Sequence, residues 1–257
     1  MPAKKSNSIK NKPPKTKPAA PKKSLIGSTA KKPAKAAKVK KIVGEGASHK
    51  RVAAILALLD EAYPLATCEL KHENAFQLLI ATILSAQCTD VRVNQVTPGL
   101  FKKYPDPKTF AYANSQDIEN EIRSTGFFRN KTKSIIGASK AIVDTFGGQV
   151  PRTMDEILTL PGVARKTGNV VLGTAFGISS GVVVDTHVMR LSRRLDLSRS
   201  EDPKTIEQDL IQIIPKDRWI KFSHQLIWHG RRICIARKPR CVDCNLETVC
   251  YSADKTI

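Results

Sequence analysis

From His49 onward, apolar side chains recur every three or four residues, the spacing of helices with one buried face. The segment from Phe76 to Ala86 is apolar nearly all round and is expected to form a buried central helix. The longest strand-like run is only Gly181–Val184. The pattern therefore predicts an all-α fold. Its expected helices span about 52–59, 76–86, 90–103, 115–123, 130–146, 154–160, 164–176, 186–195, 203–214 and 216–232.

Residues that favour helix ends set several of these boundaries. Thr89 is expected to cap the helix that follows it, and Asp202 precedes a proline at the first helical position. Asn130 is expected to cap the helix that runs to Phe146, and Gly147 to end it.

The stretch from Leu158 to Asn169 predicts two helices joined by a tight turn, a helix-hairpin-helix. Pro161-Gly162 ends the first helix, because proline lacks an amide proton and glycine favours turn geometry. Backbone N–H groups near Gly162 and Ala164 are then unpaired at the start of the second helix. Such a helix start is suited to binding an anion, for example a DNA phosphate.

Lys166 lies in the first turn of that second helix, beside Arg165, which is expected to contact DNA. The positive helix end and the neighbouring cation both disfavour a protonated amine, and a neutral amine is a nucleophile. On this feature alone, Lys166 is equally well a solvated lysine of a basic protein. An apolar run follows and ends in a carboxylate, Asp185, 19 residues after the lysine.

The length of 257 residues is enough for one large or two modest domains, and the hydrophobic share of 41% is enough for a normal core. Charge is distributed unevenly along the chain. The formal net charge is +20, and residues 1–50 hold fifteen lysines and one acid. Residues 1–48 are expected to be a disordered Lys/Pro/Ala-rich tail. The tail is interpreted as a polycation that holds the protein near DNA, with a solubilising extension as the alternative and an organellar transit peptide as a weaker one.

The chain has no run of eighteen apolar residues, and its first fifteen residues lack the apolar segment of a secretory signal. We therefore expect no membrane span and an intracellular, reducing location: bacterial cytoplasm or nucleoid, or the nucleus or an organelle of a eukaryote. In such a compartment, cysteines are ligands or free thiols. Cys68 and Cys88 are expected to be buried free thiols.

The other four cysteines lie within seventeen residues, which predicts a closed site with four sulfur ligands. Such a site selects zinc or an iron–sulfur cluster, and the spacing does not choose between them. The loop between the first two ligands carries three cations that are expected to contact DNA phosphates. The ligands are Cys234, Cys241, Cys244 and Cys250, and the cations are Arg237, Lys238 and Arg240.

Three features, in their order and spacing, resemble the endonuclease III family of DNA repair glycosylases: Leu160–Asn169, Val184–His187 and the four cysteines. The resemblance implies a six-helix barrel domain and an iron–sulfur domain with a cleft between them. Mapped onto this sequence, the barrel is 68–178 with the hairpin at 154–176, and 49–67 with 179–257 form the other domain. The resemblance also implies that the cofactor is a [4Fe-4S] cluster.

For the reaction, the resemblance implies that Lys166 attacks the anomeric carbon of a damaged nucleoside and forms a Schiff base with the sugar. β-Elimination then cuts the strand on the 3′ side. Asp185 matches the family's catalytic aspartate, and it is also a reasonable N-cap for the helix that follows.

A base inside a duplex has to be flipped out, and the gap it leaves has to be filled. Gln87 matches the glutamine that enters the gap, and Phe127 stands where many family members carry a leucine wedge. Ala164 and Gly168 replace the hairpin's usual glycine and alanine. These departures leave the basic reaction intact and put the opposite-strand preference and the rate in question.

The sequence-based hypothesis is thus a monomeric DNA glycosylase and abasic-site lyase acting on double-stranded DNA with oxidised or ring-saturated pyrimidines. The alternatives are a monofunctional adenine or uracil/thymine mismatch glycosylase, and an inactive DNA-binding module. The mismatch glycosylases tend to lack the lysine found here at position 166. Retention of Lys166 and Asp185 argues against an inactive module.

Overall fold

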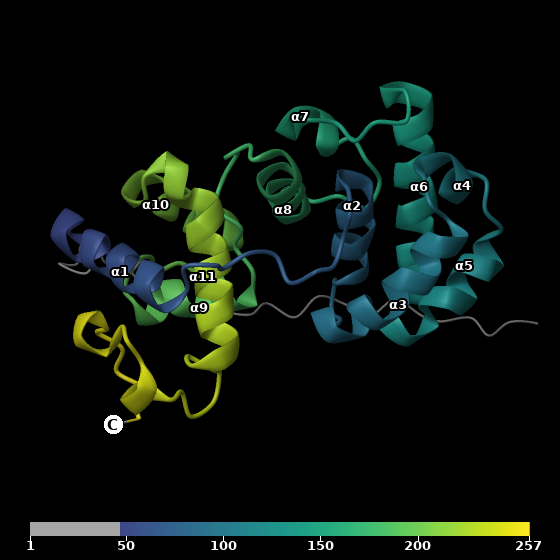
Figure 1. Cartoon of the computed structure of the whole chain (residues 1–257). Helices are drawn as coiled ribbons and strands as arrows, with labels where there is room; N and C mark the ends of the chain where they lie inside the picture. The colour runs from purple at the N-terminus through teal and green to yellow at the C-terminus, as the bar shows by residue number, and fades with distance from the viewer. Residues whose placement is uncertain (1–46, 257) are drawn as a thin grey trace, which may run out of the picture. The chain divides into compact units, whose positions relative to one another are not determined.

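The structure is a computed structural model that describes residues 47–256, so nearly all of the predicted tail at residues 1–48 lies outside the described residues. Every regular element between residues 47 and 256 is a helix, which confirms the all-α prediction (Figure 1). The α-helices are α1 (His49–Ala62), α2 (Ala75–Leu84), α3 (Asp90–Lys103), α4 (Pro107–Ala111), α5 (Ser115–Ile122), α6 (Phe128–Phe146), α7 (Met154–Ile157), α8 (Arg165–Phe176), α9 (Thr186–Arg194), α10 (Pro203–Ile213) and α11 (Trp219–Arg232). Short 3-10 helices are η2 (Arg123–Thr125), η3 (Lys216–Arg218), η4 (Cys241–Asp243) and η5 (Glu247–Val249).

The first hydrophobic core is built around α2, which is buried from Phe76 to Leu84. The predicted buried helix extends two residues too far, because Ala86 is exposed. Helices α3 to α8 pack around it, and each leucine or isoleucine of α2 that leaves water contributes about 1.5–3 kcal/mol. The fully buried residues of α2 include Leu78, Leu79, Ile80 and Leu84.

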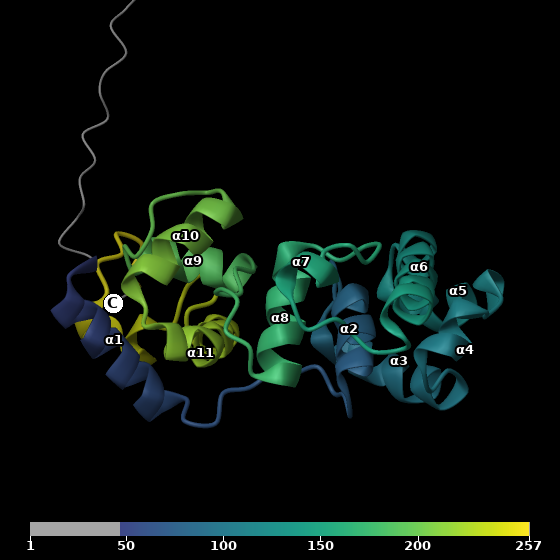
Figure 2. The same cartoon turned by 90° about the horizontal axis from the view of Figure 1, so that it is seen from above.

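A second core joins α1 to α9, α10 and α11, so the first helix packs against the last part of the chain. Figures 1 and 2 show these four helices together on one side, α2 to α6 on the other, and α7 and α8 between them. The two cores follow the segments assigned to two domains from the sequence, but the exact boundaries, 49–67 with 179–257 and 68–178, remain a prediction.

The hairpin between α7 and α8 is held against α6 by small residues. Gly162 has a φ of +76°, a left-handed conformation that side chains rarely adopt. A Cβ at this position would also collide with the side chain of Ser134 on α6. The turn predicted at Pro161-Gly162 therefore depends on glycine both for its backbone and for its packing.

Predicted caps form at two helices. The Thr89 hydroxyl accepts a hydrogen bond from the backbone N–H of Arg92, at 3.2 Å, at the start of α3. The Asp202 carboxylate accepts one from the N–H of Thr205, at 2.9 Å, and Pro203 is the first residue of α10.

The predicted start of α6 at Asn130 is wrong. Gly126 and Phe127 both have positive φ angles, and this sharp turn starts α6 at Phe128, which places Asn130 inside the first turn. The Gly147 end is confirmed, with that glycine in the left-handed conformation.

Two further details differ from the expectation. Helix α4 is additional, and it is capped by Asp106 and begins with Pro107. The run Gly181–Val184 is buried, but it forms no strand in the described part of the chain. Between residues 47 and 256, the helices are all too short or too polar to cross a membrane.

Candidate active site

Lys166 and Asp185 line the same cavity, of about 60 Å³, although they come from different helices. One wall comes from the first core, with Thr82 and Ser85 at the end of α2. The opposite wall comes from α11 of the second core, with His224, Ile227 and Arg231. The cavity therefore lies where the two cores meet, and the nucleophile and carboxylate predicted from the sequence are both at its surface.

Lys166 is the second residue of α8 and is exposed. The helix starts after Ala164, and no side chain caps its first amides. Unpaired N–H groups at a helix start attract an anion, so a DNA phosphate could bind beside the lysine. The exposed residues Gly162 and Ala164 flank this position.

Arg165, which was expected to contact DNA, forms an ion pair within the protein. Its Nε donates to the buried carboxylate of Glu207 on α10 at 2.8 Å, and the Asn169 amide donates to the same carboxylate at 2.9 Å. This network links α8 to α10. The predicted contact of Arg165 with DNA has to compete with Glu207, and it stays a prediction.

Asp185 is the N-cap of α9, which is the structural alternative considered for this residue. Its Oδ1 atom accepts hydrogen bonds from the backbone N–H groups of His187 and Val188, at 2.9 and 2.8 Å. Because both amides bind one oxygen, the carboxylate is fixed in place and its other oxygen can face the cavity. The buried run Val182–Val184 anchors the chain just before it.

Further charged residues complete the cavity wall. Arg231 forms ion pairs with Asp90, at 2.7 Å, and with Glu69, and so joins α11 to α3 and to the segment before α2. Burial lowers the pKa of His224 to about 4, so this histidine is neutral near pH 7. His224 and Arg231 are seven residues apart on α11, two helical turns, and this spacing could have placed them on one face.

Gln87 and Phe127, the residues predicted to enter the duplex, share an unusual backbone. Both are exposed, and their φ angles are +52° and +47°. Phe127 leaves 62% of its surface in water. Each residue therefore projects from a strained turn at the edge of the first core.

All four predicted cysteine ligands line one small cavity at the end of the chain. Two of the sulfurs already contact polar side chains: Arg194 Nη1 donates to Cys234 Sγ at 3.3 Å, and His229 Nε2 lies 3.4 Å from Cys244 Sγ. Burial and the neighbouring thiols raise the pKa of Cys244 to about 11.

The ligand chemistry of these thiols tests which group they fit. Zinc holds its sulfur ligands about 2.3 Å away, which crowds them together. Four cysteine thiolates are also the ligand set of an iron–sulfur cluster, so the donors that line this cavity fit such a cluster.

The loop between Cys234 and Cys241 presents its cations to solvent. Arg237, Lys238 and Arg240 are all exposed, and Lys238 has a φ of +53°. Arg240 is paired with Asp243 at 2.7 Å on the surface, an interaction of at most about 1 kcal/mol that a phosphate can replace.

Comparison with known proteins identifies the family to which the chain belongs. Residues 80–216 match the model of the HhH-GPD superfamily of base excision DNA repair proteins. Endonuclease III from Synechocystis sp. is 58% identical over 203 residues, which cover 79% of this chain and 93% of the relative. The chain belongs to the endonuclease III family.

Solved structures of endonuclease III agree with this assignment. A trapped endonuclease III–DNA covalent intermediate matches with a TM-score of 0.76 and 42% identity, over 79% of this chain and 96% of that one. A non-covalent endonuclease III–DNA complex also gives a TM-score of 0.76, with 43% identity over 79% of this chain and 95% of that one.

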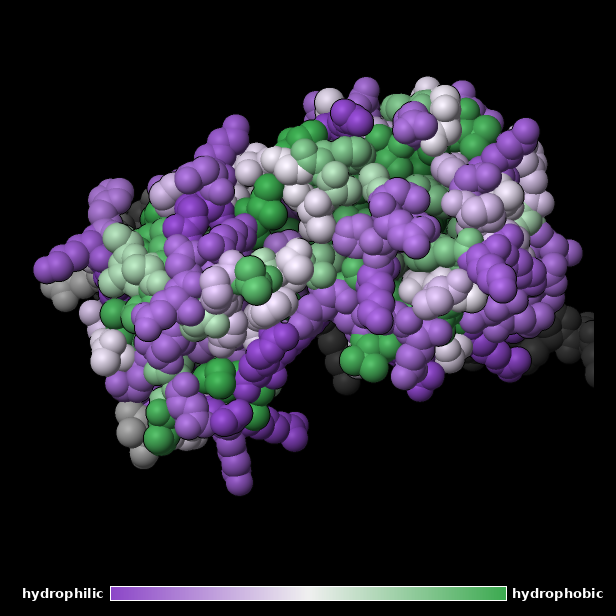
Figure 3. Space-filling view, in the orientation of Figure 1, coloured by the Kyte–Doolittle hydropathy of each residue, from purple (hydrophilic) through white to green (hydrophobic). Residues whose placement is uncertain are grey.

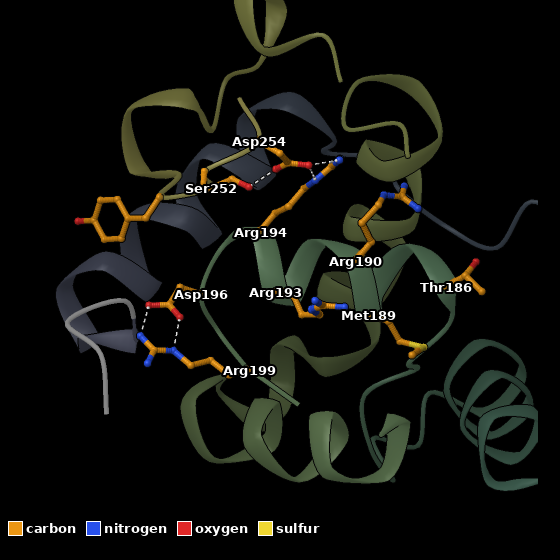
Figure 4. A pocket seen from close by; sticks show the side chains of 11 residues that line it. Thr186, Met189, Arg190, Arg193, Arg194, Asp196, Arg199, Ser252 and Asp254 are labelled. Carbon is orange, nitrogen blue, oxygen red and sulfur yellow. Dashed lines mark hydrogen bonds and ion pairs between the residues drawn. The ribbon is translucent and has the colours of Figure 1, made fainter. Parts of the chain in front are cut away.

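A larger hollow, of about 770 Å³, lies beside α9 and is not the candidate active site (Figure 4). Its guanidinium groups are already engaged: Arg194 pairs with Asp254 at 2.6 Å, and Arg199 with Asp196 at 2.9 Å. Neither Lys166 nor Asp185 lines it. In this member of the endonuclease III family, the smaller cavity, which Lys166 and Asp185 line, is therefore the candidate active site.

The surface around the hairpin is less polar than its surroundings. Figure 3 shows hydrophobic residues gathered over α7 and α8 and hydrophilic residues on both sides of them. Leu158, at the end of α7, is 40% exposed. A helix-hairpin-helix that meets DNA through backbone N–H groups does not need a highly charged surface.

Proposed function

We propose that this protein is a DNA glycosylase and abasic-site lyase that removes oxidised or ring-saturated pyrimidines and cuts the strand by β-elimination. The observation that carries the proposal is that Lys166 and Asp185 line one cavity beside an uncapped helix start. Membership of the endonuclease III family supports it, as does the trapped covalent DNA intermediate of a relative.

In the proposed reaction, Nζ of Lys166 forms a bond to C1′ of the flipped nucleotide through its lone pair. The glycosidic bond breaks, and the base leaves with its electron pair and takes up a proton. Opening of the sugar ring gives a Schiff base, and removal of a C2′ proton then expels the 3′ phosphate. The carboxylate of Asp185 would stabilise the positive charge on the sugar and help to move protons.

Asp185 also caps α9, so its two roles have to be separated by a conservative change. Asp185→Asn keeps an oxygen that can accept from His187 and Val188, and the fold should persist. Losing the negative charge should slow base excision about 100-fold. Single-turnover excision with a folded variant checks this, and a rate equal to that of the wild type would remove Asp185 from the mechanism.

Cys234, Cys241, Cys244 and Cys250 would hold a [4Fe-4S] cluster. The cluster would cross-link the last segment of the chain and, when bound, could supply one-electron chemistry. The exposed cations Arg237, Lys238 and Arg240 would then lie on a loop that is tied at both ends, facing DNA phosphates.

For DNA binding, we propose that the hairpin amides near Gly162 and Ala164 hold a phosphate beside the lesion. Gln87 and Phe127 would enter the space left by the flipped nucleotide. The structures of relatives with DNA support a DNA partner for this chain. The similar endonucleases III of Synechocystis sp. and Bacillus subtilis are bacterial proteins, which favours action inside a bacterial cell.

Borohydride trapping tests the proposed function. Wild-type protein is incubated with a duplex containing one thymine glycol, and sodium borohydride is added to reduce any Schiff base. A covalent protein–DNA adduct should form with this duplex but not with the undamaged duplex. Base release without an adduct would favour a monofunctional glycosylase, and neither product would favour a DNA-binding module.

A further inference from the structure

The loops that carry Gln87 and Phe127 share a problem of conformation. Each residue has a left-handed backbone, which costs a non-glycine residue on the order of 1–3 kcal/mol and persists only when its surroundings enforce it. Both side chains are exposed, so their own packing does not supply the constraint. The constraint has to come from the residues at which each loop leaves its preceding helix.

One buried side chain, Lys131 of α6, connects the starts of the two loops. Only 4% of Lys131 is exposed. Its Nζ donates one hydrogen bond to the carbonyl oxygen of Leu84 and another to that of Thr125, both at 2.8 Å. Leu84 ends α2, three residues before Gln87.

The second partner holds the other loop in the same way. Thr125 is the last residue of η2, two residues before Phe127. Carbonyl groups at helix ends lack a partner within their helix, so a donor there fixes the direction of the chain that follows. Helices α2 and α6 lie side by side in both views (Figures 1 and 2), which brings the two helix ends within reach of one amine.

A purely structural role does not require this lysine. Burying an amine costs free energy, and the pKa of Lys131 is lowered by that burial. An apolar side chain of similar length could fill the same space without that cost. What the amine adds is a pair of directional hydrogen bonds, stronger than neutral ones when it is protonated.

We propose that Lys131 is a positioning residue, whose amine ties the loops of Gln87 and Phe127 together so that both side chains enter the duplex in register. This inference rests on the proposed function, because it assigns Lys131 to the base-flipping step. Lys131 does not touch the cavity that contains Lys166, so it acts through the loops and not on the reacting atoms.

The test compares Lys131→Met with Lys140→Met, which removes an exposed lysine from the same helix. Both variants are mixed with a duplex that carries 2-aminopurine opposite an abasic-site analogue. The wild type and Lys140→Met should raise the fluorescence by unstacking the probe. Lys131→Met should raise it no more than a Gln87→Ala/Phe127→Ala double variant does.

Kinetics give the second readout. Single-turnover excision of thymine glycol from a duplex should fall about 10-fold to 100-fold in Lys131→Met, because misplaced groups lose that order of rate. β-Elimination at an abasic site in single-stranded DNA needs no gap filling, and its rate should be unchanged. In the Gln87→Ala/Phe127→Ala background, Lys131→Met should cause no further loss.

Three results would overturn the proposal: wild-type fluorescence with Lys131→Met, an equal loss on single-stranded and duplex DNA, or losses that add to those of the double variant. Thermal unfolding shows whether Lys131→Met is folded. If it is not, Lys131→Gln, which keeps two N–H donors on a shorter side chain, should show a smaller loss of the same kind. Failure of the wild type itself to cut abasic DNA would instead refute the proposed function.

Discussion

Replacing Lys166 by alanine should abolish strand cleavage and borohydride trapping while the protein still binds DNA. Lys166 is exposed at the start of α8, so its removal costs little packing. Loss of a nucleophile should lower the rate by at least roughly 10⁴-fold. Cleavage of a duplex with an abasic site is the measurement, with circular dichroism to confirm that the helices persist.

Lys108→Ala on α4 is the matched control, because it also removes one exposed lysine. It should keep the wild-type rate. If Lys166→Ala still cuts the strand at an appreciable rate, another amine makes the Schiff base and the assignment of Lys166 is wrong.

Cys244→Ser should have the largest effect on stability. Residues 234–256 contain only two short 3-10 helices. Only one hydrophobic side chain of this segment, Leu246, is buried. Such a segment cannot bury enough apolar surface to fold without cross-links. Loss of one ligand should release the cluster and lower the Tm by about 10 °C or more.

The effect should spread to α1, because the C-terminal segment is bonded to it. The Asn245 amide donates to the carbonyl of Leu58 at 2.6 Å, and the Arg51 guanidinium donates to the carbonyl of Val249 at 2.8 Å. Iron content and absorbance near the ultraviolet end of the visible range measure the loss of the cluster. Limited proteolysis measures the unfolding of the C-terminal segment. Cys88→Ser, which lies outside the ring of four, is the control and should keep its iron; equal iron in Cys244→Ser would contradict the ligand assignment.

Local sequence signals were sufficient for much of the fold. Thr89 and Asp202 cap α3 and α10 because a cap depends only on residues within one turn. Helix α4 was also within reach, since Asp106-Pro107 is the same pair of residue types as Asp202-Pro203. The start of α6 was not, because it depends on the left-handed backbone of Phe127, a conformation that residues other than glycine rarely adopt.

The candidate site divides in the same way. The hairpin could be predicted from Pro161-Gly162, and Lys166 and Asp185 followed from the family resemblance. No local pattern indicates that Arg231 pairs with Asp90, because the two are 141 residues apart. Lys131 was missed for a related reason: in a basic chain, one lysine that is buried cannot be told from many that are solvated.

The central claim is that the amine of Lys166 bonds to the sugar of a damaged nucleotide. The most direct measurement is to digest the borohydride-trapped adduct with a protease and a nuclease and to locate the remaining sugar by mass spectrometry. The account predicts that the added mass lies on Lys166. An adduct on any other lysine, or on the N-terminal amine, would contradict it.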